Sequence, residues 1–571
     1  MSSIDWIVLV VTLLSIVGYG VYKSRGNRNI DGYLLGNKSL PWYHIGFSVM
    51  ATQASAITFL SAPGLAYTSG MSFAQFYFGV PLAMIVLSIT FVPIFHRMRV
   101  FTAYEYLEKR FDVKTRAFTA LLFLIQRGLS TGITIYAPSV ILSSILHIDA
   151  TYTTLFIGCL VILYTVYGGT KAVSHTQLLQ MAIIFTGLLL AGVMVVHLLP
   201  SDIGLVKALH IAGKSGRANA IDFSFDWNNQ YTLWSGLIGG FFLQLSYFGT
   251  DQSQVGRYLT GASIRDSRLG LLMNGLIKVP MQFLILLIGV LVFAYYQYNQ
   301  PPIFFNKLEL KKIESSPYQS ELKKIKDDFK TVFDEKHVLI NQLSKALDDG
   351  DDPAIDDIRT KLQLANKRTA SIRQDLTDLM EKNDPKADTH DNNYIFLNFV
   401  TEKLPVGLIG LLIAIVFLAS MGSTASALNS LASTSVVDIY KRFFHKAGSD
   451  ARYLSVSRIA TLFWGIFSVA IALYASKLGN LLEAVNILGS LFYGTILGVF
   501  IVAFYMKKVN GTATFIAAIL AEILVVTCWL LKLMAFLWLN LVGCLLVMIF
   551  AFIMSFILQP VQHKHVDGNS E

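Results

Sequence analysis

The sequence contains few charged residues, and this shortage excludes an ordinary soluble protein. Charged residues make up 15% of the 571 residues, whereas hydrophobic residues make up 54% and the mean hydropathy is +0.54. A soluble domain of average composition carries about 25% charged residues. We therefore predict a multi-pass integral membrane protein whose surroundings are a lipid bilayer.

Cysteine is also scarce, and the sequence lacks motifs for metal binding or for catalysis. The three cysteines, Cys159, Cys528 and Cys544, each lie within an apolar run, which is typical of small core residues. The histidines are scattered, with no pair at the H-x-x-x-H spacing of a zinc helix. A phosphate-binding loop and a nucleophile elbow are both missing, so we predict that the protein is not an enzyme.

The net charge of +9 arises from basic residues in the short loops between apolar runs. Clusters near residues 23–28, 97–116, 257–268 and 441–452 fall on alternate connections, and therefore on one side of the membrane. This pattern places the N-terminus outside and the C-terminus inside, in a plasma or inner membrane. We expect no nucleic-acid partner.

The apolar runs predict an all-α membrane protein with about thirteen transmembrane helices, since each run is close to the roughly 20 residues that cross a bilayer. The first run carries Asp5 instead of a basic leader, so we predict a retained helix. The predicted segments are a first helix and cytoplasmic loop (1–43), two membrane units (44–199 and 230–506) separated by an extracytoplasmic loop (200–229), two C-terminal helices (507–558) and a cytoplasmic tail (559–571).

One segment, residues 303–395, breaks the membrane pattern. Its central part is dense in Lys, Asp and Glu, with apolar residues at helical intervals and a turn near 348–353. We predict an extracytoplasmic helical hairpin. It could be a mostly solvated appendage or a coiled coil that docks a protein partner.

The tract 419–440 is unusually rich in Ser, Thr, Ala and Gly for a membrane helix. Ala419, Gly422 and Ser423 share a helix face, which could present carbonyl and hydroxyl oxygens to a small hard cation. A packing seam of small residues is the alternative. An earlier run places Gln53 at membrane depth shortly before a Pro-Gly pair, which favours a broken helix.

Five short signatures give the chain its resemblance to a known family. They occupy residues 36–42, 102–111, 164–173, 249–259 and 428–440. In order and spacing they resemble the sodium/solute symporter family, whose members have the LeuT-type fold. The resemblance implies a core of five plus five helices in inverted repeats, with the 44–199 and 230–506 units as the two repeats.

The resemblance also implies a sodium site. By position, its ligands would be the carbonyl oxygens of Ala51, Ala54 and Ala419 and the hydroxyl of Ser423. Gly422 stands where family members often have a second hydroxyl. A further sodium would need an acid at Gln177 and a hydroxyl at Ala425, so we expect one sodium per cycle.

The positions that correspond to substrate contacts carry amides, hydroxyls, aromatic rings and one amine, which suit a small polar organic solute such as a sugar, a sialic acid or a carboxylate. Structural roles are the alternative for these residues. The tyrosines could pack in the core, Gln244 could form a hydrogen bond between helices, and Lys278 could extend its amine toward the membrane interface. The positions are Gln53, Thr58, Gln75, Tyr77, Gln244, Tyr247, Lys278 and Asn486.

The expected function is sodium-coupled symport of that solute into the cell by alternating access. Two alternatives are a proton-coupled symporter on the same scaffold and a membrane solute sensor that does not transport. The short C-terminal tail leaves no room for a signalling domain, and the proposed ion site has no acidic side chain to carry a proton.

Overall fold

The computed structural model describes residues 1–24, 39–98, 100–445 and 448–558. These residues form helices, with a single isolated β-bridge between Leu40 and Gly261 in this part of the chain. The all-helical class predicted from composition is confirmed. The predicted tail (559–571), residues 36–38 of the first signature and the side chains of residues 167–174 lie outside the described part.

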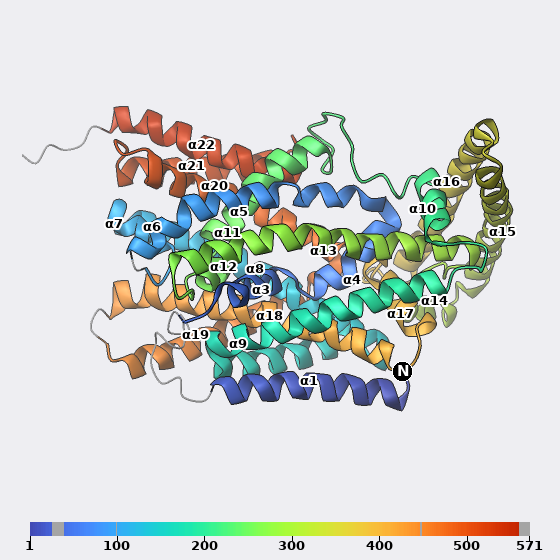
Figure 1. Ribbon diagram of the computed structural model, residues 1–571, viewed down its shortest axis with the longest axis horizontal. Coiled ribbons are helices and arrows are strands. Elements are labelled where there is room, and N and C mark those ends of the chain that lie inside the picture. Colours follow the sequence, from blue (N-terminus) through green and yellow to red (C-terminus); the bar gives the residue numbers. More distant parts are fainter. Residues whose placement is uncertain (25–38, 99, 446–447, 559–571) are drawn as a thin grey trace, which may run out of the picture.

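Ten helices within the described residues are long and apolar enough to cross a membrane. They run side by side along the long axis of the molecule (Figure 1). Large apolar side chains such as Leu14, Ile466 and Phe556 are exposed on the outside, as expected of a surface that faces lipid. The spanning helices are α1 (Ser3–Ser24), the α4 to α6 series (Ala56–Ser69, Gly79–Ile89 and Phe91–Met98, with the 3₁₀ helix η2, Gly70–Tyr77), α8 (Val113–Leu146), α9 (Ala150–His197), α13 (Ile264–Tyr298), α18 (Leu408–Thr434), α19 (Asp450–Ala472), α20 (Leu481–Tyr505), α21 (Gly511–Leu530) and α22 (Phe536–Ile557).

A shorter apolar stretch, Ala150–Val166, forms the first part of α9. The helical path is interrupted at two further places: α3 (Trp42–Gln53) ends just before α4, and α11 (Gly240–Thr250) ends just before α12 (Gln252–Tyr258). The multi-pass architecture is therefore clear. The count of thirteen spans, the orientation of the termini and the repeat boundaries stay predictions.

Helix α18 lies at the centre of the bundle. In its most apolar stretch 89% of residues are buried, compared with 22% in α1. It packs against α1, α8 and α9. Small residues permit this close approach: a Cβ on Gly410 would lie 2.2 Å from the Asp5 carbonyl oxygen, so no side chain fits there.

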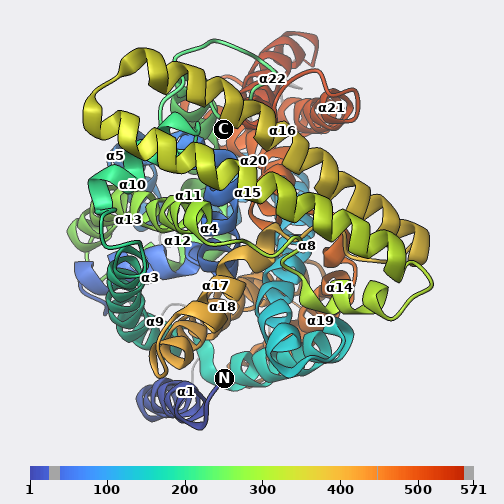
Figure 2. The same ribbon diagram turned by 90° about the vertical axis from the view of Figure 1, so that its right-hand side faces the viewer.

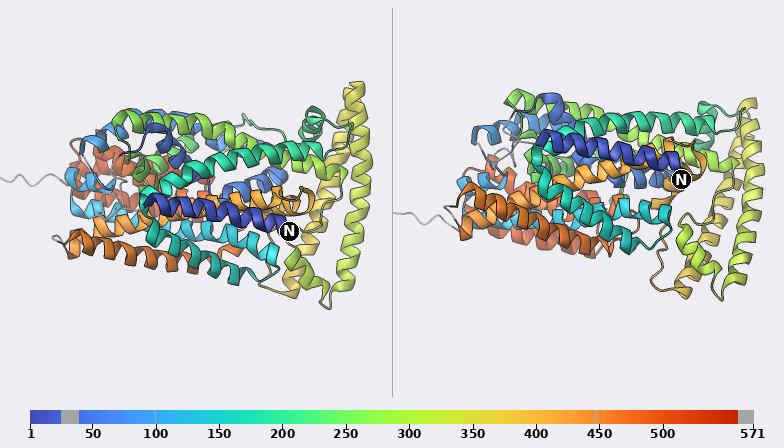
Figure 3. Two further views of the ribbon diagram at one scale, coloured as in Figure 1. Left: turned by 60° about the horizontal axis from the view of Figure 1, so that its bottom comes forward. Right: turned by 90° about the horizontal axis from the view of Figure 1, so that it is seen from below.

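The charged segment between α13 and α18 forms three helices: α14 (Lys307–Glu314), α15 (Gln319–Asp349) and α16 (Asp352–Asn383). The two long ones make a hairpin whose turn uses Gly350 in the left-handed conformation, at φ +66°. The hairpin lies across one end of the bundle (Figures 2 and 3).

The hairpin packs against the membrane helices. Its buried residues Ile340, Leu343 and Ile358 belong to the same apolar core as the bundle. Polar contacts add to the docking, since Lys207 of α10 (Leu205–Lys214) forms an ion pair with Asp348 at 2.7 Å. Part of the apolar side of the hairpin is thus covered by the bundle. Docking of a protein partner at this segment stays a prediction.

Candidate ion and solute site

The break between α3 and α4 deprives backbone carbonyl groups of their helical partners. In a continuous helix the Ser55 N–H would donate to the Ala51 carbonyl, and the Thr58 N–H to the Ala54 carbonyl. Instead Ser55 donates to the Gln53 carbonyl (3.0 Å), and Thr58 donates to the Ser55 carbonyl (3.0 Å). The predicted ligand carbonyls of Ala51 and Ala54 are therefore among those that lose their helical partners.

Helix α18 supplies the other predicted ligands, and it packs against both α3 and α4. The Ser423 hydroxyl donates to the Ala419 carbonyl oxygen at 2.9 Å, so the two oxygen atoms are neighbours on one face. The described residues contain no group of three or more His, Cys, Asp or Glu side chains that could hold a metal. Neutral oxygens of this kind suit a hard monovalent cation.

Gly422 faces α9 instead of completing a pair of hydroxyls. A Cβ at this position would lie 2.7 Å from the side-chain oxygen of Gln180, so a serine or threonine would require the Gln180 side chain to shift. The Gly422 carbonyl accepts hydrogen bonds from Ser426 (2.8 Å) and from Gln177 (3.3 Å). Close packing against the glutamines of α9 favours a glycine here.

Gln177 joins three helices through a network of neutral groups. Its amide nitrogen lies within hydrogen-bond distance of Thr52 Oγ1 (3.3 Å), Gly422 O (3.3 Å) and Ser426 Oγ (3.1 Å). Its amide oxygen accepts from the Ser48 hydroxyl at 2.6 Å. The nitrogen thus donates to oxygens that could otherwise contact a cation.

A buried cavity of about 80 Å³ lies beside the helix break. It is smaller than the 300–1,000 Å³ typical of ligand pockets, so an organic solute requires its walls to move apart. Helices α4, α8, α11 and α20 all contribute to it. Six of the predicted substrate residues line it: Gln53, Thr58, Tyr77, Gln244, Tyr247 and Asn486.

The two remaining predicted residues, Gln75 and Lys278, lie outside the lining of this cavity. Gln75 is fully buried and bonds to backbone, donating to the Tyr231 carbonyl (2.9 Å) and accepting from the Asp222 N–H (2.9 Å). Lys278 lies behind the wall, with its amino group 5.7 Å from the centre of the Tyr77 ring. Gln75 therefore holds a loop, and Lys278 contacts the cavity only through Tyr77.

Arg127 of α8 is a lining residue that the sequence reasoning missed. Its guanidinium forms an ion pair with Asp251, the residue at the break between α11 and α12, and lies 5.4 Å from the centre of the Tyr247 ring. The Tyr493 hydroxyl donates to the same carboxylate at 2.9 Å. The sequence did carry a signal for this residue, because an arginine within an apolar membrane helix usually has a functional role or a buried partner.

A second ionic cluster ties three elements together where α18 continues into the helical turn Ser435–Phe444. The Asp438 carboxylate accepts from Thr102 Oγ1 (2.8 Å) and from Arg116 Nε (2.8 Å), and Arg116 also donates to Glu108 (2.7 Å). Three of these side chains lie in the 102–111 and 428–440 signatures. Those signatures thus meet in space and serve a structural contact.

Comparison with known proteins gives consistent matches. The model of the family described as "Sodium:solute symporter family" matches residues 33–303 and 384–521. A sodium/sialic acid symporter of Aliivibrio fischeri is 25% identical over 91% of this chain and 86% of its own length. A sodium/glucose cotransporter of Vibrio parahaemolyticus is 26% identical over 91% of this chain and 84% of its own length.

A solved structure shares the fold. A sodium-coupled sialic acid symporter in an outward-open state superposes with a TM-score of 0.76 at 23% identity, over 98% of this chain and 99% of its own. The family match omits residues 304–383, which include both long helices of the hairpin. The chain belongs to the sodium:solute symporter family, and it is a sodium-coupled membrane transporter, not an enzyme.

Proposed function

We propose that the protein carries a small hydroxylated carboxylate of the sialic acid type into the cell, together with one sodium ion per cycle. The carbonyls freed at the helix break carry this proposal, because a partnerless carbonyl within a membrane protein favours a ligand. The sodium ligands would be the carbonyls of Ala51, Ala54 and Ala419 and the hydroxyl of Ser423.

The solute class rests on the chemistry of the cavity lining and on the relatives. Amides and hydroxyls such as Gln53, Gln244 and Asn486 can bond to sugar hydroxyl groups, and Arg127 supplies a positive charge for a carboxylate. Two relatives of nearly full coverage are sodium/sialic acid symporters, from Aliivibrio fischeri and Proteus mirabilis. Arg127 donates to Asp251 and Ser253 through Nη2, and its buried Nε has no hydrogen-bond partner among the described residues, so a donor is left for the solute.

The neutral network around Gln177 supports a stoichiometry of one sodium. The amide nitrogen donates to the oxygens at this position, and a neutral amide supplies no negative charge to hold a second cation. Ala425 adds no oxygen. A monovalent carboxylate that moves with one sodium gives an electroneutral cycle, driven by the sodium concentration gradient alone.

Sodium and solute are coupled if both favour the same conformation, since a ligand with equal affinity for two states shifts neither. Sodium between α18 and the α3–α4 break would hold the two elements together. Gln53 and Thr58 lie on either side of the same break, and both line the cavity. We also propose thirteen spans in inverted repeats, with the N-terminus outside, in the plasma or inner membrane.

Uptake by proteoliposomes tests this function. Labelled N-acetylneuraminate is expected to accumulate with an inward sodium gradient, and not with an equal potassium gradient. A proton gradient without sodium serves as the third arm. Accumulation that follows protons and ignores sodium would favour the proton-coupled alternative, and binding without any uptake would favour the sensor.

A further inference from the structure

A second cavity lies under the hairpin, at the opposite end of α4 from the helix break. Its volume is about 380 Å³, within the range of small-molecule pockets. Tyr67 of α4 and Phe293 of α13 form its floor, and Phe333 and Lys336 of α15 form part of its roof. Because α4 has 14 residues, the cavity is about 20 Å from the break, at 1.5 Å per residue.

Positive charge exceeds negative charge in this cavity. Arg217, Lys336 and Arg373 line it, and Asp391 is the one acidic residue in its lining among the described residues. Asp391 already accepts two hydrogen bonds from Arg373, at 2.6 and 2.7 Å. Arg217 and Lys336 form no ion pair within the described residues, so two cations remain without a counter-charge.

The fold holds Arg217 firmly in place. Helix α10 ends in a turn with Gly216 at φ +80°, which lets the Arg217 N–H donate back to the Ala212 carbonyl at 2.8 Å. The Arg217 carbonyl accepts from Met71 N–H at 3.0 Å, and its guanidinium lies 5.3 Å from the centre of the Phe293 ring. Its buried Nε has no hydrogen-bond partner among the described residues.

Lys336 lies within the electrostatic influence of the like charge on Arg217. Burial and the neighbouring Arg217 lower the pKa of Lys336 to about 8, and burial lowers the pKa of Arg217 as well. The lowered pKa values mean that folding makes the charged forms of Lys336 and Arg217 less favourable than they are in water. An anion between the two groups would offset this effect.

We propose that this cavity binds a small organic anion, with its carboxylate between Arg217 and Lys336 and its apolar side between the aromatic rings of Phe293 and Phe333. The site is distinct from the transport cavity. Lys336 and Phe333 belong to the 304–383 segment, which lies outside the residues that the family model matches. The site lies at the C-terminal end of α4, where η2 begins with Gly70 and Met71.

Calorimetric titration of the full-length protein in nanodiscs tests the proposal. The buffer contains no sodium, so that sodium-dependent binding of a solute at the transport cavity does not contribute to the signal. The probes are benzoate, phenylacetate and N-acetylneuraminate, with chloride as the inorganic comparison. At least one carboxylate is expected to bind saturably, and Lys336→Gln and Arg217→Gln should each weaken it tenfold or more.

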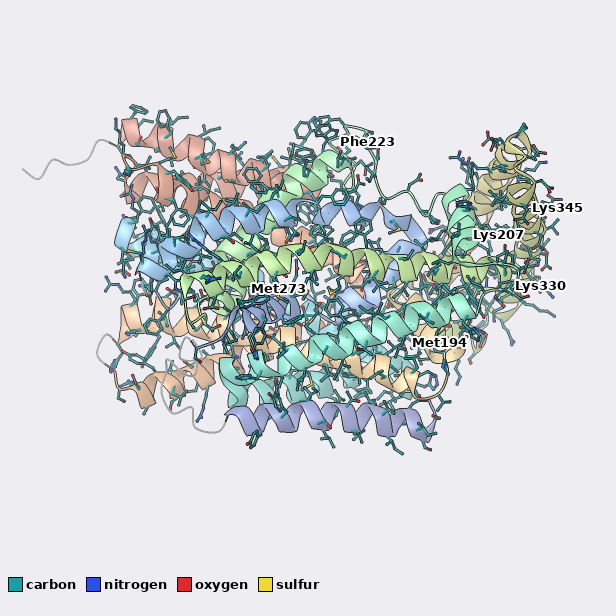
Figure 4. The ribbon with its side chains drawn as sticks, viewed as in Figure 1. Met194, Lys207, Phe223, Met273, Lys330 and Lys345 are labelled. Atoms are coloured by element: carbon teal, nitrogen blue, oxygen red, sulfur yellow. The ribbon has the colours of Figure 1, made fainter. Side chains whose placement is uncertain are left out.

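Three control variants separate this site from other effects. Lys330→Gln alters an exposed lysine at the outer edge of the same helix (Figure 4) and should leave binding unchanged. Lys336→Arg keeps the charge and should retain binding, which also shows that the hairpin is folded. Gln53→Ala alters only the transport cavity and should have no effect.

Three results would overturn the proposal: no saturable binding of any of the three carboxylates, equal binding by Lys336→Gln and Lys330→Gln, or binding lost in Gln53→Ala. The outcome is independent of the transport function. If sodium-driven uptake fails but binding still depends on Lys336, only the proposed transport function is refuted.

Discussion

At the scale of residues, the ion site depends on backbone groups more than on side chains. Ala51 and Ala54 have no polar side chains, and only the interruption after Gln53 makes their carbonyls available. A glutamine followed by small residues and a Pro-Gly pair made this interruption predictable from the sequence. The change of hydrogen-bond partner at Ser55 required coordinates, because no sequence pattern specifies it.

Replacing Ser423 by alanine tests the side-chain ligand. A contact with a charged group contributes about 1.5–3 kcal/mol, so the apparent sodium affinity should fall roughly ten- to a hundredfold. Sodium titration of solute uptake measures the change. The matched control is Ser430→Ala, because Ser430 lies further along the same helix and donates to the Ala427 carbonyl at 2.7 Å. Equal sodium affinities in the two variants would refute the assignment.

The solute cavity shows where sequence reasoning reached its limit. Gln53, Tyr77 and Gln244 face the cavity, but the equally polar Gln75 turns away to bond to the backbone of a distant loop. The sequence identifies a polar residue within an apolar run. Whether its side chain points into the cavity depends on how the helices pack, which the sequence alone does not specify. Arg127 lies within an apolar stretch, and such a stretch predicts a membrane helix without indicating a charged side chain in its binding cavity.

At the scale of elements, the Arg116–Asp438 ion pair fixes α8 against the end of α18. Both side chains are buried, with side-chain exposures of 9% and 0%. Removing one partner of a buried pair typically costs about 3–5 kcal/mol, since the other charge is left uncompensated. Arg116→Ala should therefore lower the thermal unfolding temperature clearly.

The control for this prediction is Arg458→Ala, which removes an exposed arginine from α19. Thermal unfolding of both variants in detergent gives the comparison. Adding Asp438→Asn to Arg116→Ala should recover part of the loss, because the stranded charge is then gone. A double variant no more stable than Arg116→Ala would contradict the role of the buried charge.

The chain that leads from the hairpin back to the bundle should respond to pH through Asp388. Burial raises the pKa of this carboxyl from 3.8 to about 7, and the Tyr394 hydroxyl donates to it at 3.2 Å. An acid whose pKa is raised by folding stabilises the folded state at low pH and loses that effect as pH rises. Segment 384–394 should therefore open more readily at pH 8 than at pH 5.

Hydrogen exchange of this segment, corrected for the intrinsic effect of pH, measures the opening. Asp388→Asn should remove the pH dependence, because the amide stays neutral. Asp375→Asn, at an exposed position on α16, should retain it. An unchanged pH dependence in Asp388→Asn would show that Asp388 does not control the segment.

At the scale of the whole molecule, the protein is an apolar helical bundle with a charged hairpin across one end. Hydropathy alone predicted the membrane class, and the helical spacing of Phe329, Val332 and Leu343 matched residues that are buried in the hairpin. The docking of the hairpin was not predictable, because a charged amphipathic helix looks alike whether it covers its own bundle or another protein.

The stoichiometry can be measured through the effect of membrane potential on N-acetylneuraminate accumulation. Proteoliposomes with a fixed sodium gradient are clamped at 0 and at −100 mV inside. One sodium per monovalent carboxylate moves no net charge, so the account predicts equal accumulation at both potentials. A second sodium would gain about 2.3 kcal/mol per 100 mV, and accumulation would then rise roughly fiftyfold at −100 mV. Such a rise, or accumulation without sodium, would contradict a single-sodium symporter.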